Sequence, residues 1–288
     1  MELLIFGLVN GATLALLALG FSFVFGISRI ANFAHGAFYV LASFLAYGLL
    51  SATGLPYIIV IVFTIISTAG IGALMYWLVI FRLKGQMVSE VIATFSLGIA
   101  IIEFFRLLGL SGTIYGLPTL IEGAIEIGEA VVDYQRIAIC GVGLFLVAFL
   151  WYFTHYTKVG LACRGMAQDE NTALCFGIDT DLTAVMSLAV GGALVATAAI
   201  TISPLGFIDI DEGYRVMVFA LAVGVVGGLE STMGIVAGAL LIGFAQSAVS
   251  IYVAPHFRMV VPLGSILLVL AIRPSGLFGR FKELEERV

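Results

Sequence analysis

The chain has 288 residues, a formal net charge of -5 and a mean hydropathy of +1.17. Hydrophobic residues make up 61% of it and charged residues only 11%. A soluble globular domain carries roughly 25% charged residues, so this chain has too few to cover a water-facing surface. It also lacks a basic run that would suit nucleic acid, which excludes that class of partner. The composition therefore predicts an integral membrane protein.

The amino-terminal segment and the cysteines give two further expectations. Glu2 is followed directly by apolar residues, without the basic segment and small-residue cleavage site of a signal peptide, so we expect a retained first span. The cysteines, Cys140, Cys163 and Cys175, are odd in number and form no C-x-x-C pair. We expect them to be apolar fillers or free thiols, with neither a disulfide framework nor a zinc site.

Membrane spans are predicted from apolar blocks, because about 20 such residues are needed to cross the hydrocarbon core. Segments 36–52 and 214–229 are short or rich in glycine, so each is a candidate for a broken or re-entrant helix. We predict eight to ten crossings in one all-α, polytopic transmembrane bundle that forms a single domain over residues 1–288. The predicted spans cover residues 3–26, 36–52, 57–81, 88–110, 134–154, 181–201, 214–229, 233–253 and 259–272.

The orientation follows from lysine and arginine, which concentrate on the cytoplasmic side of membrane proteins. Most of them fall on alternate joints, which predicts the N-terminus outside and the C-terminus inside. The opposite joints, 111–133 and 202–213, are poor in basic residues. Arg136, Arg215 and Arg258 are exceptions near outer span ends, where their side chains can reach the headgroups. The residues on the cytoplasmic joints are Arg29, Arg82, Lys84, Lys158, Arg164, Arg273, Arg280, Lys282 and Arg287.

Glycine is abundant, with 34 residues. The pairs Gly7/Gly11 and Gly234/Gly238 have the GxxxG spacing that brings two helices into close contact in a membrane. The cluster at 224–228 is different, because adjacent glycines weaken a helix. Broken helices in a membrane protein lie in the protein interior or line a cavity, so this cluster favours a transport path over a structural anchor.

Charged residues inside the predicted spans are few. Glu103 and Arg106 lie three residues apart on one helical face, and we expect a structural ion pair near the outer end in preference to a proton relay. Glu90 and Glu230 fall near inner span ends, where water reaches them. No series of carboxylates crosses the bilayer, which argues against a carrier driven by protons or sodium.

The joint at residues 32–36 carries polar side chains, an aromatic ring and a glycine where a lipid-facing helix has none. A single histidine is more often a packing residue than a ligand. A gate, or the start of a helix, fits the segment equally well. We predict that Asn32, Phe33, His35 and Gly36 line or hinge a translocation path.

The cytoplasmic loop at about 155–180 predicts a docking segment. Residues 166–176 read as one short amphipathic helix that Gly177 ends. Asp169 and Glu170 would repel an anionic lipid leaflet, so docking on a cytoplasmic protein is favoured over lying on the membrane. Its narrow apolar stripe is expected from Met166, Ala173 and Leu174.

The loop sequence RGMAQDENTALCFGID resembles the coupling loop of permeases in the branched-chain amino-acid ABC importer family, where Arg-small-x-x-Gln-Asp precedes an alanine and Gly-Ile. The segments NGATLALLALGFSFVFGI and NFAHGAFYVL are similar to the opening spans of that family. So are GVVGGLESTMGIVAGALLIG and RPSGLFG near the end. The resemblance covers nearly the whole chain in the expected order. It departs at Gly165, where the family commonly has alanine.

The resemblance implies a permease in a prokaryotic inner (plasma) membrane. Such a permease pairs with a second homologous permease subunit, two cytoplasmic ATPase subunits and an extracytoplasmic solute-binding protein. The loop G-x-x-x-x-G-K-[ST] that cradles ATP phosphates is absent from the sequence, so the chain is expected to be no enzyme and to need no cofactor. The residues that match the ATPase-coupling segment are Arg164, Gln168, Asp169, Glu170, Ala173 and Gly177.

Leucine, isoleucine and valine are the default solutes that the resemblance implies. Close relatives carry urea or short amides, and more distant ones carry sugars or nucleosides. Three other classes remain as alternatives. A secondary carrier needs ionisable residues at the membrane midplane, and a membrane enzyme needs a polar constellation such as H-E-x-x-H. A passive channel is harder to exclude, since small residues and backbone can line a pore. The predicted docking helix argues against a channel.

Overall fold

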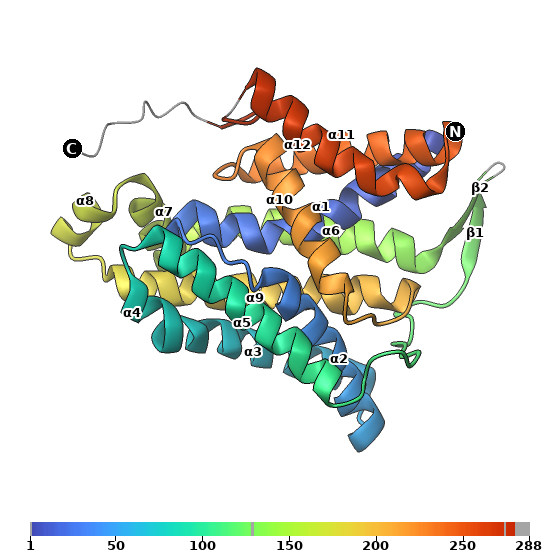
Figure 1. The fold of residues 1–288 in the computed structure, drawn as a ribbon, viewed down its shortest axis with the longest axis horizontal. Coiled ribbons are helices and arrows are strands. Elements are labelled where there is room, and N and C mark those ends of the chain that lie inside the picture. Colours follow the sequence, from blue (N-terminus) through green and yellow to red (C-terminus); the bar gives the residue numbers. More distant parts are fainter. Residues whose placement is uncertain (1, 128–129, 274, 280–288) are drawn as a thin grey trace.

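A computed structural model describes residues 2–127, 130–273 and 275–279 of the chain, which fold into a bundle of helices with one small hairpin (Figure 1). The long helices and the hairpin are α1 (Glu2–Ser28), α2 (His35–Thr53), α3 (Tyr57–Met75), α5 (Met87–Leu107), β1 (Ala124–Ile127), β2 (Ala130–Asp133), α6 (Tyr134–Tyr156), α9 (Thr180–Ile202), α10 (Glu212–Gly227), α11 (Thr232–Tyr252) and α12 (Val260–Ile272). The shorter elements are the π-helix η1 (Tyr76–Ile80), α4 (Phe81–Leu83), α7 (Lys158–Gln168), α8 (Glu170–Cys175) and the 3-10 turns η2 (Ser203–Leu205) and η3 (Pro255–Met259).

The predicted all-α polytopic bundle is confirmed. Within the described residues, 8 helical segments are long and apolar enough to cross a membrane, and each overlaps one of the predicted spans. The remaining predicted span, 214–229, is α10, which has 16 residues. At 1.5 Å per residue it is about 24 Å long, short of the roughly 30 Å of hydrocarbon. The segment is therefore short for a full crossing, but it is one continuous helix. The other candidate for a broken helix, 36–52, forms the continuous helix α2, which is long enough to span.

The loop at 111–133 contains a structure that the sequence did not predict. β1 and β2 pair in antiparallel register, with Ala124 opposite Asp133, and extend beyond the helices at one end of the bundle (Figure 1). An isolated two-stranded hairpin is marginal in water, so it depends on the helices below it. The Gln135 side chain at the start of α6 supplies one such tie, donating to the carbonyl of Thr201 at 2.7 Å.

Helix ends gather on two opposite faces of the bundle. The hairpin face holds the hairpin, the start of α1 and the end of α5; there Arg106 Nη2 bonds to Asp211 Oδ1 at 2.9 Å. The α7–α8 face holds the end of α1, the start of α9 and helices α7 and α8; there Arg29 forms an ion pair with Glu230. The predicted Glu103–Arg106 ion pair is also present, on the hairpin face.

The bundle contains two halves that run in opposite directions, α1–α5 and α9–α12. α1 and α9 cross at the centre, where a Cβ on Gly20 would lie 2.9 Å from the carbonyl oxygen of Gly191. α1 packs against α11 through Gly11 and Gly243, and α9 packs in the equivalent way against α3 through Gly192. Inverted repeats of this kind are typical of transport proteins, whose binding sites lie at the repeat interface.

The starts of α2 and α10 meet at this interface. A Cβ on Gly36 would overlap the carbonyl oxygen of Gly213, and one on Gly213 would lie 3.0 Å from the oxygen of Gly36. The connections that lead to the two helices, residues 29–34 and 206–211, have the same length. Both short helices therefore begin inside the bundle at one shared contact.

The glycine pairs pack as their spacing predicts. Gly7 and Gly11 face Phe244 and Leu240 of α11, and Gly238 lies against the backbone of Gly227. α10 ends at Gly227, and the next residue, Gly228, has a φ of +100° that favours glycine. The glycine cluster thus ends a helix, and its place beside a transport path stays a prediction.

Burial divides the helices into a central and a peripheral set. Of the most apolar stretch of α9, 67% is buried, against 6% for the η3–α12 span and 22% for α5 and for α6. Large apolar side chains are exposed on the peripheral helices, for example Phe145 on α6 and Leu267 on α12. In water such faces would be unstable, so they are surfaces for lipid or for another membrane subunit.

Candidate functional site

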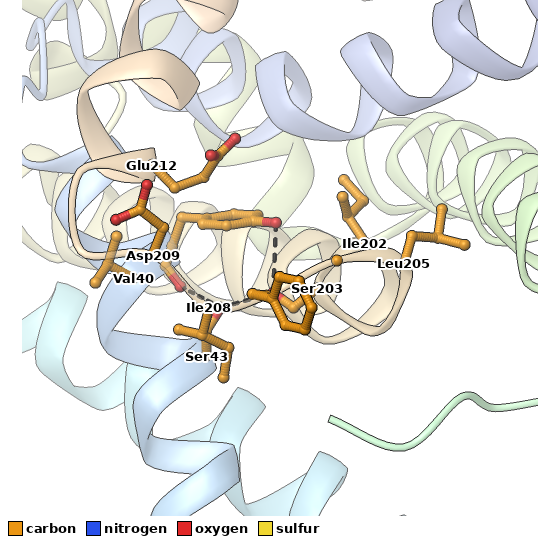
Figure 2. A pocket seen from close by; sticks show the side chains of 11 residues that line it. Val40, Ser43, Ile202, Ser203, Leu205, Ile208, Asp209 and Glu212 are labelled. Atoms are coloured by element: carbon orange, nitrogen blue, oxygen red, sulfur yellow. Dashed lines mark hydrogen bonds between the residues drawn. The ribbon is translucent and has the colours of Figure 1, made fainter. Parts of the chain in front are cut away.

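A cavity of about 320 Å³ lies at the hairpin face, between α2 and the segment that joins α9 to α10 (Figure 2). One part of its wall is polar and another is apolar. The polar side chains are Tyr39, Ser43, Ser203, Asp209 and Glu212. The apolar side chains include Val40, Ile202, Leu205, Phe207 and Ile208. We call this the hairpin-face cavity.

The hydroxyl groups of the cavity form a connected chain (Figure 2). Ser43 donates its hydroxyl to the Tyr39 carbonyl at 3.0 Å, and its Oγ lies 2.9 Å from Ser203 Oγ. The Tyr39 hydroxyl lies 3.4 Å from Ser203 and completes the chain. All three side chains are buried, so this wall is rigid.

The two carboxylates of the cavity, Asp209 and Glu212, form a triad with Arg215, which lines a neighbouring cavity, at the start of α10. Arg215 Nη2 lies 2.8 Å from Asp209 Oδ2 and 2.5 Å from Glu212 Oε2. Two carboxylates facing one guanidinium leave the triad with a formal charge of -1. The cavity is therefore a favourable place for a cationic group, because low-dielectric walls focus the field of the unbalanced carboxylate.

A second cavity, of about 270 Å³, shares Tyr39, Ile202 and Glu212 with the first. It lies between α1, α10, α11 and η3. Its amides form their own network: Arg258 Nη2 donates to Asn10 Oδ1 at 3.1 Å, and Gln246 Nε2 donates to the Arg258 carbonyl at 3.3 Å. The two cavities together make a polar region on both sides of the contact between α2 and α10.

The segment predicted to line or hinge the path packs inside the protein. Asn32 Oδ1 accepts the Ala34 N–H at 3.0 Å, and His35 is buried with its Nε2 at 2.9 Å from the carbonyl of Leu17. A carbonyl only accepts, so Nε2 carries the proton. The Phe33 ring contacts an α5 phenylalanine edge-on. Together with Gly36 these residues form the start of α2, and they line neither of the two cavities. Their role as a hinge stays a prediction.

The residues of the cavity wall were missed by the sequence analysis. One signal was available: Tyr39, Val40 and Ser43 follow Gly36 at spacings of three, four and seven, and so share its helical face. The predicted hinge and the cavity wall are thus adjacent turns of one helix face. Glu212 has no such signal, since its position at the mouth depends on where the segment 203–211 folds.

The predicted single helix over 166–176 is wrong; two helices, α7 and α8, meet at Asp169. Asp169 has the extended φ and ψ of -159° and 116°, and its side chain accepts the N–H of Thr172 at 2.6 Å. An aspartate in this position caps a new helix instead of continuing the old one. Gly177 ends α8 with a φ of +78°, donating its N–H to Leu174 at 3.0 Å, as predicted.

The other residues predicted for the coupling segment lie on both sides of α7–α8. Arg164 and Gln168 are exposed, Ala173 is buried, and Glu170 forms an ion pair with Lys84 at 3.2 Å. Of the expected apolar stripe, Met166 and Ala173 are buried but Leu174 is 51% exposed. The adjacent Phe176, which the sequence analysis did not select, is 82% exposed. The tip of α8 therefore presents two apolar side chains away from the bundle.

A bundle of inverted halves, with a polar cavity between them at one face and an apolar-tipped helix pair at the other, defines a membrane permease. The family described as "Branched-chain amino acid transport system / permease component" matches residues 3–270, and the chain belongs to this family.

Two relatives and one solved structure support this placement. The permease protein BraD of the high-affinity branched-chain amino acid transport system of Pseudomonas aeruginosa is 30% identical, covering 97% of this chain and 96% of its own. LivH of Salmonella typhimurium, described in the same words, is 28% identical over 95% of this chain and 94% of its own. The structure of PsaBC from Streptococcus pneumoniae in complex with Fab shares the fold, with a TM-score of 0.51 and 13% identity, covering 96% of this chain and 94% of that chain.

Proposed function

We propose that the chain is the membrane-spanning permease subunit of an ABC importer, and that it forms a translocation path for branched-chain amino acids. The observation that carries the proposal is the family match over residues 3–270, in a chain that has a polar cavity at one face and a docking segment at the other. The solute would enter at the hairpin-face cavity and leave at the α7–α8 face. ATP hydrolysis would belong to separate subunits.

The proposed orientation places the hairpin face outside the cell and the α7–α8 face in the cytoplasm of a prokaryote. The short joints support it, because more basic residues lie on the joints of the α7–α8 face than on those of the hairpin face. Basic residues that favour the cytoplasmic side are counted over the short joints. On the α7–α8 face these are Arg29, Arg82, Lys84, Lys158, Arg164 and Arg273.

Each end of the proposed path would have its own partner protein. Two cytoplasmic ATPase subunits would dock on the coupling helices of the permease pair, which in this chain are α7–α8. There Leu174 and Phe176 offer the apolar anchor that a protein interface needs at its centre. An extracytoplasmic binding protein would deliver the solute to the hairpin face. A second homologous permease would cover one of the exposed apolar faces. ATP-driven closure of the ATPases would then displace α8 and switch the path between its two openings.

The hairpin-face cavity supports an amino acid over urea or a short amide. Its two carboxylates, Asp209 and Glu212, exceed by one charge the guanidinium of Arg215 that pairs with both of them, and they suit an ammonium group. Its apolar wall, which includes Val40 and Ile208, suits a branched aliphatic side chain. Urea has neither group. A volume of about 320 Å³ lies within the range of pockets that hold small ligands.

The class of the protein is tested by purifying this chain from detergent-solubilised native membranes and identifying what accompanies it. We expect an ATPase subunit and a second permease. Recovery of this chain alone, still moving solute in liposomes without ATP, would instead establish a carrier or a channel.

The solute is tested with Glu212→Gln in the reconstituted complex, with Asp211→Asn as the matched control, because Asp211 pairs with Arg106 and lies outside the hairpin-face cavity. Loss of a charge-assisted bond of about 1.5 kcal/mol corresponds to a KM for leucine about tenfold higher in the Glu212 variant alone. Urea uptake by the unaltered complex, with no leucine uptake, would refute the proposed solute.

A further inference from the structure

Lys84 joins three separate elements on the α7–α8 face. It follows α4, in the connection between α3 and α5. Its Nζ lies 3.2 Å from Glu170 Oε1 on α8 and 2.7 Å from Asp181 Oδ1 on α9. A third contact, to Thr180 Oγ1, measures 3.4 Å. One ammonium group, on the connection that follows α4, thus binds both the docking segment and α9.

Asp181, which binds Lys84 on α9, is itself held by a buried residue. Tyr76 is buried and donates its hydroxyl to Asp181 Oδ1 at 2.6 Å, the same oxygen that binds Lys84. Tyr76 begins the π-helix η1, which runs to Ile80 and replaces the α-helical pattern at the end of α3. Such π-helical turns are irregularities that frequently occur at functional sites. The ammonium therefore binds Asp181, which a buried tyrosine holds in place, and Glu170, which lies on the short surface helix α8.

The two ion pairs of Lys84 are unequal, and there is room beside them. The pair with Glu170 is longer than the pair with Asp181, by 3.2 Å against 2.7 Å. Burial alone would lower the pKa of Lys84, but the bonds to Asp181 and Glu170 outweigh it and raise the pKa, so the group stays charged. A cavity of about 130 Å³, also lined by Glu90 and Arg29, lies against it. A displacement of α8 can therefore stretch the Glu170 pair while the Asp181 pair holds.

We propose that Lys84 is the positioning residue that carries a displacement of α8 into α9 and the π-helical end of α3. The inference rests on the proposed function, since it takes α7–α8 as the segment that the ATPase moves. In the described state the ammonium ties α8 to the bundle. When α8 moves, the pull on the Glu170 pair acts on the ammonium and, through the shorter pair, on Asp181, which changes the support of α3 and α9. Lys84 thus couples the ATP-driven motion of α8 to the helices α3 and α9.

The test uses the complete importer in proteoliposomes and measures solute transported per ATP hydrolysed. Lys84→Gln is expected to lower this ratio at least about threefold, a size typical of coupling through one partly exposed ion pair. Lys84→Arg, which keeps the charge, is expected to restore the ratio. Arg82→Gln is the matched control, because Arg82 is exposed, lies two residues away and has no ion pair within the described residues.

A double-substitution cycle separates transmission from simple folding. If Lys84 acts through Glu170, adding Glu170→Gln to Lys84→Gln lowers the ratio no further. An unchanged ratio in Lys84→Gln overturns the inference. A loss of hydrolysis and uptake in equal proportion overturns it too, because that is the effect of a merely structural residue. If the unaltered complex shows no ATP-dependent uptake, the proposed function fails before any variant is compared.

Discussion

Replacing Gly36 by alanine tests the contact between α2 and α10, on which the arrangement of the two inverted halves depends. The added Cβ would overlap the carbonyl oxygen of Gly213 and would lie 3.0 Å from its carbonyl carbon and 3.1 Å from Met217 Cβ. Ordinary contacts begin at 3.4 Å, so the carbon atoms alone require a separation of 3.4 - 3.0 = 0.4 Å and the oxygen requires more. The atoms to be displaced are backbone, which cannot turn aside as a flexible side chain does.

The expected cost of Gly36→Ala is at the upper end of the 1–3 kcal/mol typical of overpacking, about 3 kcal/mol. Gly48→Ala on the same helix is the control, because no atom lies within 4 Å of the position a Cβ would take there. Alanine is the better helix former, so this control should gain roughly 0.5–1 kcal/mol. The assay is the midpoint of thermal unfolding of the two purified variants in one detergent, with solute uptake measured beside it.

We expect Gly36→Ala to unfold at a lower temperature than the unaltered chain and to lose uptake, and Gly48→Ala to do neither. Equal midpoints and equal uptake for the two variants would refute the close contact between the starts of α2 and α10. An unchanged midpoint with uptake lost would instead place Gly36 in the moving part of the path.

Three further outcomes follow from the α7–α8 face. Phe176→Ser should lower co-purification of the ATPase about fivefold, as loss of a central interface anchor does, with the unfolding midpoint unchanged because the side chain is 82% exposed. In a Cys140→Ala background, a membrane-impermeant maleimide should label Cys175 in inside-out vesicles but not in right-side-out ones. Cys163 should stay unlabelled in both below the pH at which its thiolate forms, because burial raises the pKa of its thiol to about 11; the label is located by peptide mass. Gly165→Ala should leave the midpoint of thermal unfolding equal or higher, because the added Cβ would contact only the end of a flexible side chain, at 3.1 Å. A lower unfolding midpoint would contradict the described packing of α7.

Local features of this chain were predictable because their causes are local. A span requires a run of apolar residues, and each such run of sufficient length forms a helix here. Gly177 ends α8 because its φ of +78° is one that other residues rarely adopt. Glu103 and Arg106 pair because three residues separate them on one helix.

The features that depend on distant residues were not predictable. Gly36 and Gly213 form a single contact, yet no pattern in the sequence connects positions so far apart. The cavity needs the segment 203–211 to fold back against α2, which places Asp209 and Ser43 on the wall of one cavity. The break between α7 and α8 has a local cause, because Asp169 caps the start of α8. The residues on either side of Asp169 favour a helix, so the sequence pattern predicted one continuous helix instead.

Uptake of leucine by proteoliposomes that contain this chain and its co-purified partners, measured with and without ATP at the α7–α8 face, tests the central claim most directly. The proposed function predicts uptake into the compartment that holds the ATP, and it predicts that uptake depends on ATP hydrolysis and on a binding protein at the hairpin face. Leucine uptake that proceeds equally without ATP, or that requires the nucleotide at the hairpin face, would contradict it.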